Sequence, residues 1–174
     1  MTTESELRWL DFSGAPALLV PTILAALWRG TIDPSTGDHR DCNPDYPVTD
    51  YDRACAVCWP GKGILELAGT PILVFYSEYD HHSWDSSRLL YVSPIIPSDE
   101  DLRNAKWSDP IRWRAEHTDY VLMNSAADAK QGLKVDDFIP VQLQPGIYTV
   151  TYADTSSEYC GCAYRLLRDA TGPY

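Results

Sequence analysis

The chain has 174 residues, of which 44% are apolar and 11% aromatic, a composition that predicts one folded domain over residues 1–174. Its 25 acidic and 14 basic residues leave a net charge of −11. Such a charge disfavours nucleic acid and membrane surfaces as partners, because both bind clustered Lys and Arg, and it favours a basic protein as partner.

The first 30 residues predict two short strands and a short helix. Strands are expected over 7–12 and 17–20, where apolar residues lead into turn residues. Pro21 stands where a helix would begin, and Gly30 is a candidate for its C-terminal cap. The apolar residues at helical spacing between them, which we expect on one packed face, are Ile23, Leu24, Leu27 and Trp28.

Residues 33–52 differ from the rest of the chain. They contain six Asp and three Pro and almost no aliphatic side chain, which predicts a long loop. Loops of this length in compact proteins are usually functional or mobile. Thr49 or Asp50 is the expected N-cap of a short helical turn that follows.

The remaining signals are mostly those of β-strands. We expect a hairpin of 64–67 with 71–76, a polar connection over 77–87, and a short helix over 97–107 capped by Ser98. A second hairpin is predicted between 138–143 and 147–152, since Pro145-Gly146 suits a type II turn. Further strands are expected over 88–93, 111–117, 119–124 and 160–167. The fold class predicted is α+β, mostly antiparallel sheet with one or two short helices.

Motifs of catalysis are not readable in the sequence. It has no Gly-rich phosphate loop, no G-x-S-x-G elbow and no H-E-x-x-H helix, so we expect neither enzyme activity nor a cofactor. The pairs Cys55/Cys58 and Cys160/Cys162 would formally supply four zinc ligands, but buried thiols explain them more simply. The odd total of five Cys argues against a disulfide framework.

The compartment predicted is the cytoplasm. The N-terminus is polar and acidic and lacks the pattern of a signal peptide. The longest apolar stretch, residues 15–28, is interrupted by two prolines and is too short to span a bilayer.

Two segments combine carboxylates with aromatic side chains, as an interface for a basic protein would. The candidate contact residues of the first are Asp38, Asp41, Asp45, Tyr46, Asp50, Tyr51 and Asp52, and those of the second are Glu78, Asp80, Trp84 and Asp85. A merely solubilising surface would carry the same residue types. Asp50 and Arg53 also suit a structural role, capping and pairing around the helical turn.

Several motifs resemble the immunity protein 21 family of bacterial polymorphic toxin systems. The similar segments are 9–21, the Leu27-Trp28-Arg29-Gly30 step, Asp38, 49–57, and the Gly-rich step at 61–67 into the hairpin. The likeness spans roughly residues 7–125. It implies a cytoplasmic protein that binds a cognate toxin domain tightly and blocks its active site or substrate path. A nuclease toxin, which has a basic surface, would suit the charge of this chain.

Two other functions stay open. A small metal-dependent hydrolytic enzyme would use His81, His82 and Asp85, although adjacent His in a strand point in different directions. A non-catalytic adaptor subunit would use Trp84 and Trp107 as anchors.

Overall fold

The structure is a computed structural model that describes residues 10–11, 15–58, 62–75, 81–85, 89–91, 98–154 and 162–170. For residues 11, 81–85, 89–91, 154 and 162 within these ranges, the structure describes the backbone only. The strands are β1 Leu10–Asp11, β2 Ala17–Pro21, β3 Lys62–Leu67, β4 Thr70–Phe75, β5 His81–Asp85, β6 Leu89–Tyr91, β7 Lys106–Trp107, β8 Ile111–Ala115, β9 Asp119–Asn124, β10 Phe138–Gln142, β11 Gly146–Asp154 and β12 Cys162–Arg168. The helices are α1 Asp50–Val57 and α2 Asp99–Asn104, with 3₁₀ turns η2 Thr22–Leu27, η3 Ala129–Gln131 and η4 Val135–Asp137.

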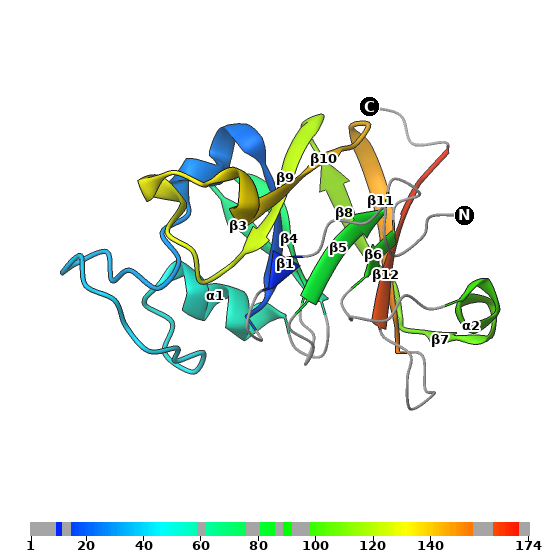
Figure 1. The fold of residues 1–174 in the computed structure, drawn as a ribbon, viewed down its shortest axis with the longest axis horizontal. Coiled ribbons are helices and arrows are strands. Elements are labelled where there is room, and N and C mark those ends of the chain that lie inside the picture. Colours follow the sequence, from blue (N-terminus) through cyan, green and yellow to red (C-terminus); the bar gives the residue numbers. More distant parts are fainter. Residues whose placement is uncertain are drawn as a thin grey trace.

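These strands form two antiparallel sheets (Figure 1). The five-stranded sheet has the order β10-β9-β2-β4-β3. In the seven-stranded sheet the order is β1-β5-β6-β12-β11-β7, and β8 also pairs with β11. The predicted fold class, mostly antiparallel sheet with short helices, is confirmed.

The five-stranded sheet is buried on both faces, which explains why its central strand β2 is apolar throughout. One face carries Leu19 and Leu122 into a core shared with Trp113 and Tyr164 of the other sheet. The opposite face carries Leu18 and neighbours into a second core that α1 and the segment around Trp28 cover. The Trp28 indole N–H donates to the Ser125 carbonyl at 2.7 Å, so this large buried ring has no unpaired polar atom.

The two sheets are joined by one long ribbon that bends. Residues 111–124 pair with residues 138–150 in an unchanged register, so that Asp119 lies opposite Gln142 in one sheet and Ala115 opposite Gly146 in the other. Between the sheets the Leu143 N–H still donates to the Thr118 carbonyl at 2.9 Å. We call these two segments the bent ribbon.

The hairpin predicted between 138–143 and 147–152 is therefore wrong, because its two strands lie in different sheets. Residues 144–146 do turn the chain, but they carry it from one sheet to the other. The Arg168 guanidinium donates twice to the Pro145 carbonyl, at 3.1 and 2.9 Å. Gly146 has a φ of +150°, far from the value of about +80° that a type II turn requires at its third residue.

Other local predictions hold or need correction. The β3–β4 hairpin and the caps Thr49 and Ser98 are confirmed. The helix expected over 97–107 ends at Asn104, because Trp107 joins β7 and pairs with Ala153. The polar connection predicted over 77–87 contains the strand β5, which pairs with β1 and β6.

The prediction of one packed apolar face on the helix after Pro21 is also partly wrong. This segment is a 3₁₀ turn, so its side chains do not keep α-helical spacing. Trp28 is fully buried, but Ile23 is 77% and Leu27 51% exposed. None of the helices within the described ranges has the length and apolar character needed to cross a membrane.

Candidate functional site

The loop between Ile32 and α1 is held at its first turn by a buried carboxylate. We call residues 33–49 the acidic loop; it projects at the left of Figure 1. The Asp33 carboxylate accepts from the Ser35 hydroxyl at 2.6 Å, the Ser35 N–H at 2.8 Å and the Arg40 guanidinium at 2.8 Å. The Ser35 hydroxyl and N–H, followed by Arg40, lower the pKa of Asp33 from 3.8 to about 2.

A second buried carboxylate closes the end of the acidic loop. Asp52 accepts from the backbone N–H groups of Asn43 at 2.6 Å, Val48 at 3.0 Å and Thr49 at 2.9 Å. Its own N–H donates to the Thr49 hydroxyl at 3.0 Å, which completes a capping box at the start of α1. Burial raises the pKa of the Asp52 carboxyl, but the three backbone donors outweigh burial, and the net pKa is lowered.

Asp50 is also committed to the fold. One oxygen accepts from the Arg29 backbone N–H at 2.9 Å, and the other pairs with the Arg53 guanidinium at 3.0 Å. Arg53 donates in addition to the Glu66 carbonyl at 2.8 Å, so the pair ties the start of α1 to β3. Asp50 and Arg53 thus form the pair that the sequence offered as part of their structural role, whereas Thr49 and Asp52 cap the helix.

The predicted contact residues now separate into two groups. Asp38, Asp41, Asp45 and Tyr46 are exposed on the acidic loop, and Tyr46 is 77% exposed. Asp50 and Asp52 point into the fold, and Tyr51 is half-buried. Of the second segment, Glu78 and Asp80 lie outside the described residues, and only the backbone of Trp84 and Asp85 is described, in β5.

Three thiols gather beside Tyr51, where the acidic loop meets α1. Partial burial, then the neighbouring Cys55 and Asp52, raise the pKa of the Cys42 thiol to about 12, although Cys42 as a residue is exposed. Burial also raises the pKa of Cys55, and that of Cys58 to about 11. Thiols that resist ionisation are weak nucleophiles and weak metal ligands.

The described residues hold no group of three or more His, Cys, Asp or Glu arranged for a metal ion. Cys55 lies on α1 and Cys58 caps its C-terminus and joins the core on the far face of the five-stranded sheet, whereas Cys162 has its backbone in β12 of the seven-stranded sheet. The structure therefore places these two parts of the formal zinc set in different layers. Cys160 and the side chains of His81 and His82 lie outside the description.

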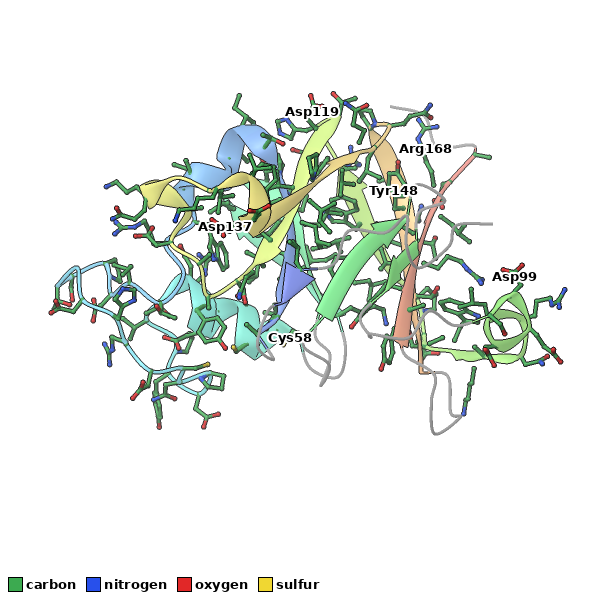
Figure 2. The ribbon with its side chains drawn as sticks, in the orientation of Figure 1. Cys58, Asp99, Asp119, Asp137, Tyr148 and Arg168 are labelled. Carbon is green, nitrogen blue, oxygen red and sulfur yellow. The ribbon has the colours of Figure 1, made fainter. Side chains whose placement is uncertain are left out.

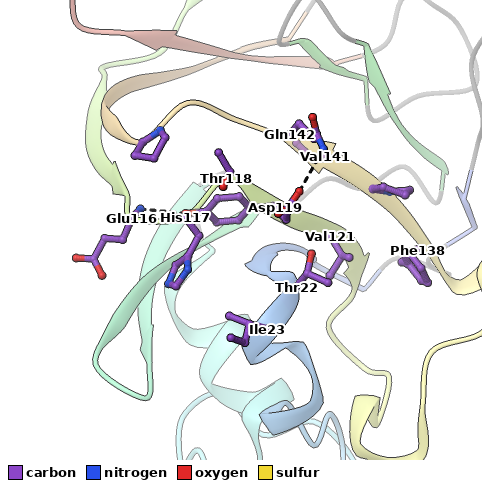
Figure 3. Close-up of a pocket in the computed structure, with 13 residues that line it drawn as sticks. Thr22, Ile23, Glu116, His117, Thr118, Asp119, Val121, Phe138, Val141 and Gln142 are labelled. Atoms are coloured by element: carbon purple, nitrogen blue, oxygen red, sulfur yellow. Dashed lines mark hydrogen bonds between the residues drawn. The ribbon is translucent and has the colours of Figure 1, made fainter.

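Sequence reasoning missed a cleft of about 700 Å³ at the bend of the ribbon (Figure 3). We call it the ribbon cleft. Thr22 and Ile23 of η2 form one side, residues 116–121 a second, and Phe138 with 140–142 and Pro145 a third. Thr22 and Ile23 are more than 90 residues away in the chain from the other two sides, so no local sequence pattern predicts the cleft. The one signal was the apolar Ile23 on a short turn.

Hydrogen bonds fix the bend beneath the ribbon cleft. The buried Tyr120 hydroxyl accepts from the N–H groups of Glu116 at 3.1 Å and His117 at 3.3 Å. The Gln142 amide donates to the Asp119 carboxylate at 3.2 Å. Figure 2 shows Asp119 at the top of the view, apart from the acidic loop at the left.

The fold and these surfaces describe a small α+β protein of two antiparallel sheets, with a fixed acidic loop and an open cleft. The sequence model of the family described as immunity protein 21 matches residues 8–159, most of the chain, and the chain therefore belongs to this family. Comparison with curated proteins and with solved structures found no match.

Proposed function

We propose that the chain binds and neutralises a cognate toxin domain in the cytoplasm of the cell that makes the toxin, using the acidic loop as a contact surface. Family membership supports the immunity role. The choice of this surface rests on one observation: the carboxylates in and next to the loop divide into buried ones and exposed ones. Asp33 and Asp52 hold its backbone from inside, while Asp38, Asp41 and Asp45 face solvent.

The fixed backbone favours binding because little freedom remains to be lost. A loop that orders only on association spends part of its interaction energy on that ordering, whereas the acidic loop is already closed by Asp52. Tyr46 adds a large, exposed, amphipathic side chain of the type that often dominates interface energetics.

The partner that this surface fits is basic. Three exposed carboxylates on a chain of net charge −11 accelerate encounter with a cationic surface and repel anionic partners. A nuclease toxin presents such a surface to its nucleic acid, so blocking it would stop the reaction without any chemistry from the inhibitor. In this proposal the chain is not an enzyme and needs no cofactor.

Growth rescue tests the immunity role. Expression of the toxin gene that adjoins the gene of this chain should arrest growth, and co-expression of the chain should restore it. An unrelated acidic protein of similar charge is the control, and its co-expression should not restore growth. If the chain fails to restore growth although both proteins are present and folded, the immunity role is wrong.

A triple variant tests the surface. Replacing Asp38, Asp41 and Asp45 by Asn should slow association with the purified toxin domain about tenfold at low salt and flatten its salt dependence, since charges at an interface rim act mainly on the association rate. Thermal stability should change by less than about 2 °C, because these side chains are exposed.

The matched control removes three exposed charges elsewhere, with Asp99→Asn, Glu100→Gln and Asp109→Asn, at and near α2. It has the same net charge as the loop variant and should associate at close to the wild-type rate. Equal slowing by both variants would mean that net charge, and not the acidic loop, steers the toxin.

A further inference from the structure

The ribbon cleft is preformed and its shape is held by the backbone. On one wall the Tyr120 hydroxyl accepts two N–H groups, and across the bend the Leu143 N–H donates to Thr118. On the other side Arg168 donates twice to the Pro145 carbonyl. A cleft of about 700 Å³ with fixed walls is within the size range of ligand sites and requires little reorganisation on binding.

The apolar part of the cleft is partly uncovered. Val121 is buried at its floor and Phe138 is half-buried, but Ile23 at the rim is 77% exposed. Leu27, on the same 3₁₀ turn as Ile23, is 51% exposed. Single exposed apolar residues are ordinary, but this turn presents two of them and Ile23 borders a concave site, which is typical of a binding surface.

The charged part of the cleft has one sign. Glu116 and Asp119 are exposed among its lining residues, and none of the thirteen lining residues, all within the described ranges, is Lys or Arg. Gln142 orients the Asp119 carboxylate, and in Figure 3 the His117 ring extends toward Ile23, below Asp119. The cleft therefore offers an apolar floor and wall with acidic groups at its edge.

The edge strand of the cleft disfavours one common mode of binding. β10 ends the five-stranded sheet, and Pro140 stands at its centre. In an antiparallel ladder, hydrogen-bonded pairs alternate with pairs that are not hydrogen-bonded. Leu143 forms a hydrogen-bonded pair with Thr118, so Pro140, three residues earlier and opposite Val121, falls in a pair that is not hydrogen-bonded, and its nitrogen faces away from β9. A partner strand added to this edge would find no N–H there, so the cleft is suited to inserted side chains.

We propose that the ribbon cleft receives a segment of the toxin domain that carries a lysine or arginine next to an apolar side chain. The apolar side chain packs against Ile23 and Phe138, and the cation lies at Asp119 and Glu116. Long basic side chains suit such a site, because their alkyl stems cover apolar surface while the charged head stays at a carboxylate. This inference rests on the proposed toxin binding and adds a second contact surface to the acidic loop.

Binding kinetics of cleft variants with the purified toxin domain test the inference. Ile23→Ser should weaken affinity at least tenfold, mainly through faster dissociation, because it removes an apolar anchor. The double variant Glu116→Gln, Asp119→Asn should weaken affinity about fivefold and lower the salt dependence; its Asn can still accept from the Gln142 amide. Ile23, Glu116 and Asp119 are all exposed, so their substitution should leave the unfolding midpoint close to that of the wild type.

Matched controls remove the same chemistry elsewhere. Leu167→Ser removes an apolar side chain that is 55% exposed on β12, and Asp99→Asn with Glu100→Gln removes two charges from α2. Both should bind within twofold of the wild type. If the wild type binds the toxin and the cleft variants bind as tightly, the cleft inference is wrong while the proposed function stands. If the wild type itself does not bind the toxin, the proposed function fails and this inference fails with it.

Discussion

Replacing Asp52 by Ala should open the acidic loop and destabilise the protein by about 3 kcal/mol. The change removes a carboxylate that accepts three backbone N–H groups. Water can replace the lost acceptor at the exposed Asn43 and Val48, but the Thr49 N–H is buried, and an unpaired buried donor costs about 1–3 kcal/mol. This Thr49 N–H bond is the half of the capping box that the change removes, since the Thr49 hydroxyl can still accept from the N–H of residue 52. Loss of the charge-assisted bonds at the other two donors supplies the rest.

Asp52→Asn should fall between the wild type and Ala. In the wild type, one Asp52 oxygen serves Val48 and Thr49 and the other serves Asn43, so an amide oxygen can keep the first two bonds while the third is lost. Asp45→Ala, on the same loop but exposed, is the control and should cost less than about 0.5 kcal/mol.

Urea unfolding gives the free energies, and hydrogen exchange reports the loop directly. With Ala at position 52, the amides of Asn43, Val48 and Thr49 should exchange faster, and the melting temperature should fall by about 6–12 °C. A destabilisation below about 1 kcal/mol, or unchanged exchange at these amides, would refute the argument that Asp52 closes the loop.

Three further predictions concern the packing and the titration of the fold. Gly30→Ala should destabilise the protein by more than about 2 kcal/mol, because the new Cβ would lie 2.3 Å from the Ala126 carbonyl oxygen. The control Gly37→Ala, also at positive φ but with open space around it, should cost about 1 kcal/mol. Equal losses of stability in thermal melts would contradict the steric argument. Tyr120→Phe should cost about 1–2 kcal/mol in urea unfolding and should speed exchange of the Glu116 and His117 amides, which lose their acceptor. Folding lowers the pKa of Asp33 from 3.8 to about 2 and also lowers that of Asp52, so the stability that these carboxylates contribute should be complete above about pH 4 and lost as pH falls from 3.8 toward 2. Asp33→Asn should flatten this fall in the free energy of unfolding. Parallel curves of stability against pH for the wild type and the variant would contradict the prediction.

Local signals predicted local structure well in this chain. Thr49 and Ser98 stand three residues before an Asp in short helices, and each forms the cap expected of it. The β3–β4 hairpin closes at Ala68-Gly69, where a two-residue turn joins strands that are adjacent in sequence. In both cases the interactions that decide the structure lie within a few residues of one another.

Pairing between distant segments was beyond such signals. Residues 138–143 and 147–152 have the pattern of a hairpin around Pro145-Gly146, yet they pair with two different parts of residues 111–124. That choice depends on how two sheets share the core around Trp113 and Tyr148, which no short pattern encodes.

The candidate site was predictable as a segment but not residue by residue. The sequence located the acidic loop correctly but did not distinguish the inward carboxylates in the loop and at the start of α1 from the exposed ones. Asp33 and Asp52 differ from Asp41 and Asp45 only in what the folded backbone places around them. The ribbon cleft was missed altogether, because it is assembled from Ile23, Asp119 and Phe138, which come together only in the fold.

Hydrogen exchange of the chain, free and in complex with the toxin domain, tests most directly that the toxin is bound through the surfaces named here. The account predicts slower exchange in the complex for amides of residues 36–48 in the acidic loop and of residues 116–119 at the ribbon cleft, with α2 unchanged. Protection confined to α2 or to the outer face of the seven-stranded sheet, with the loop and the cleft exchanging as in the free protein, would contradict it.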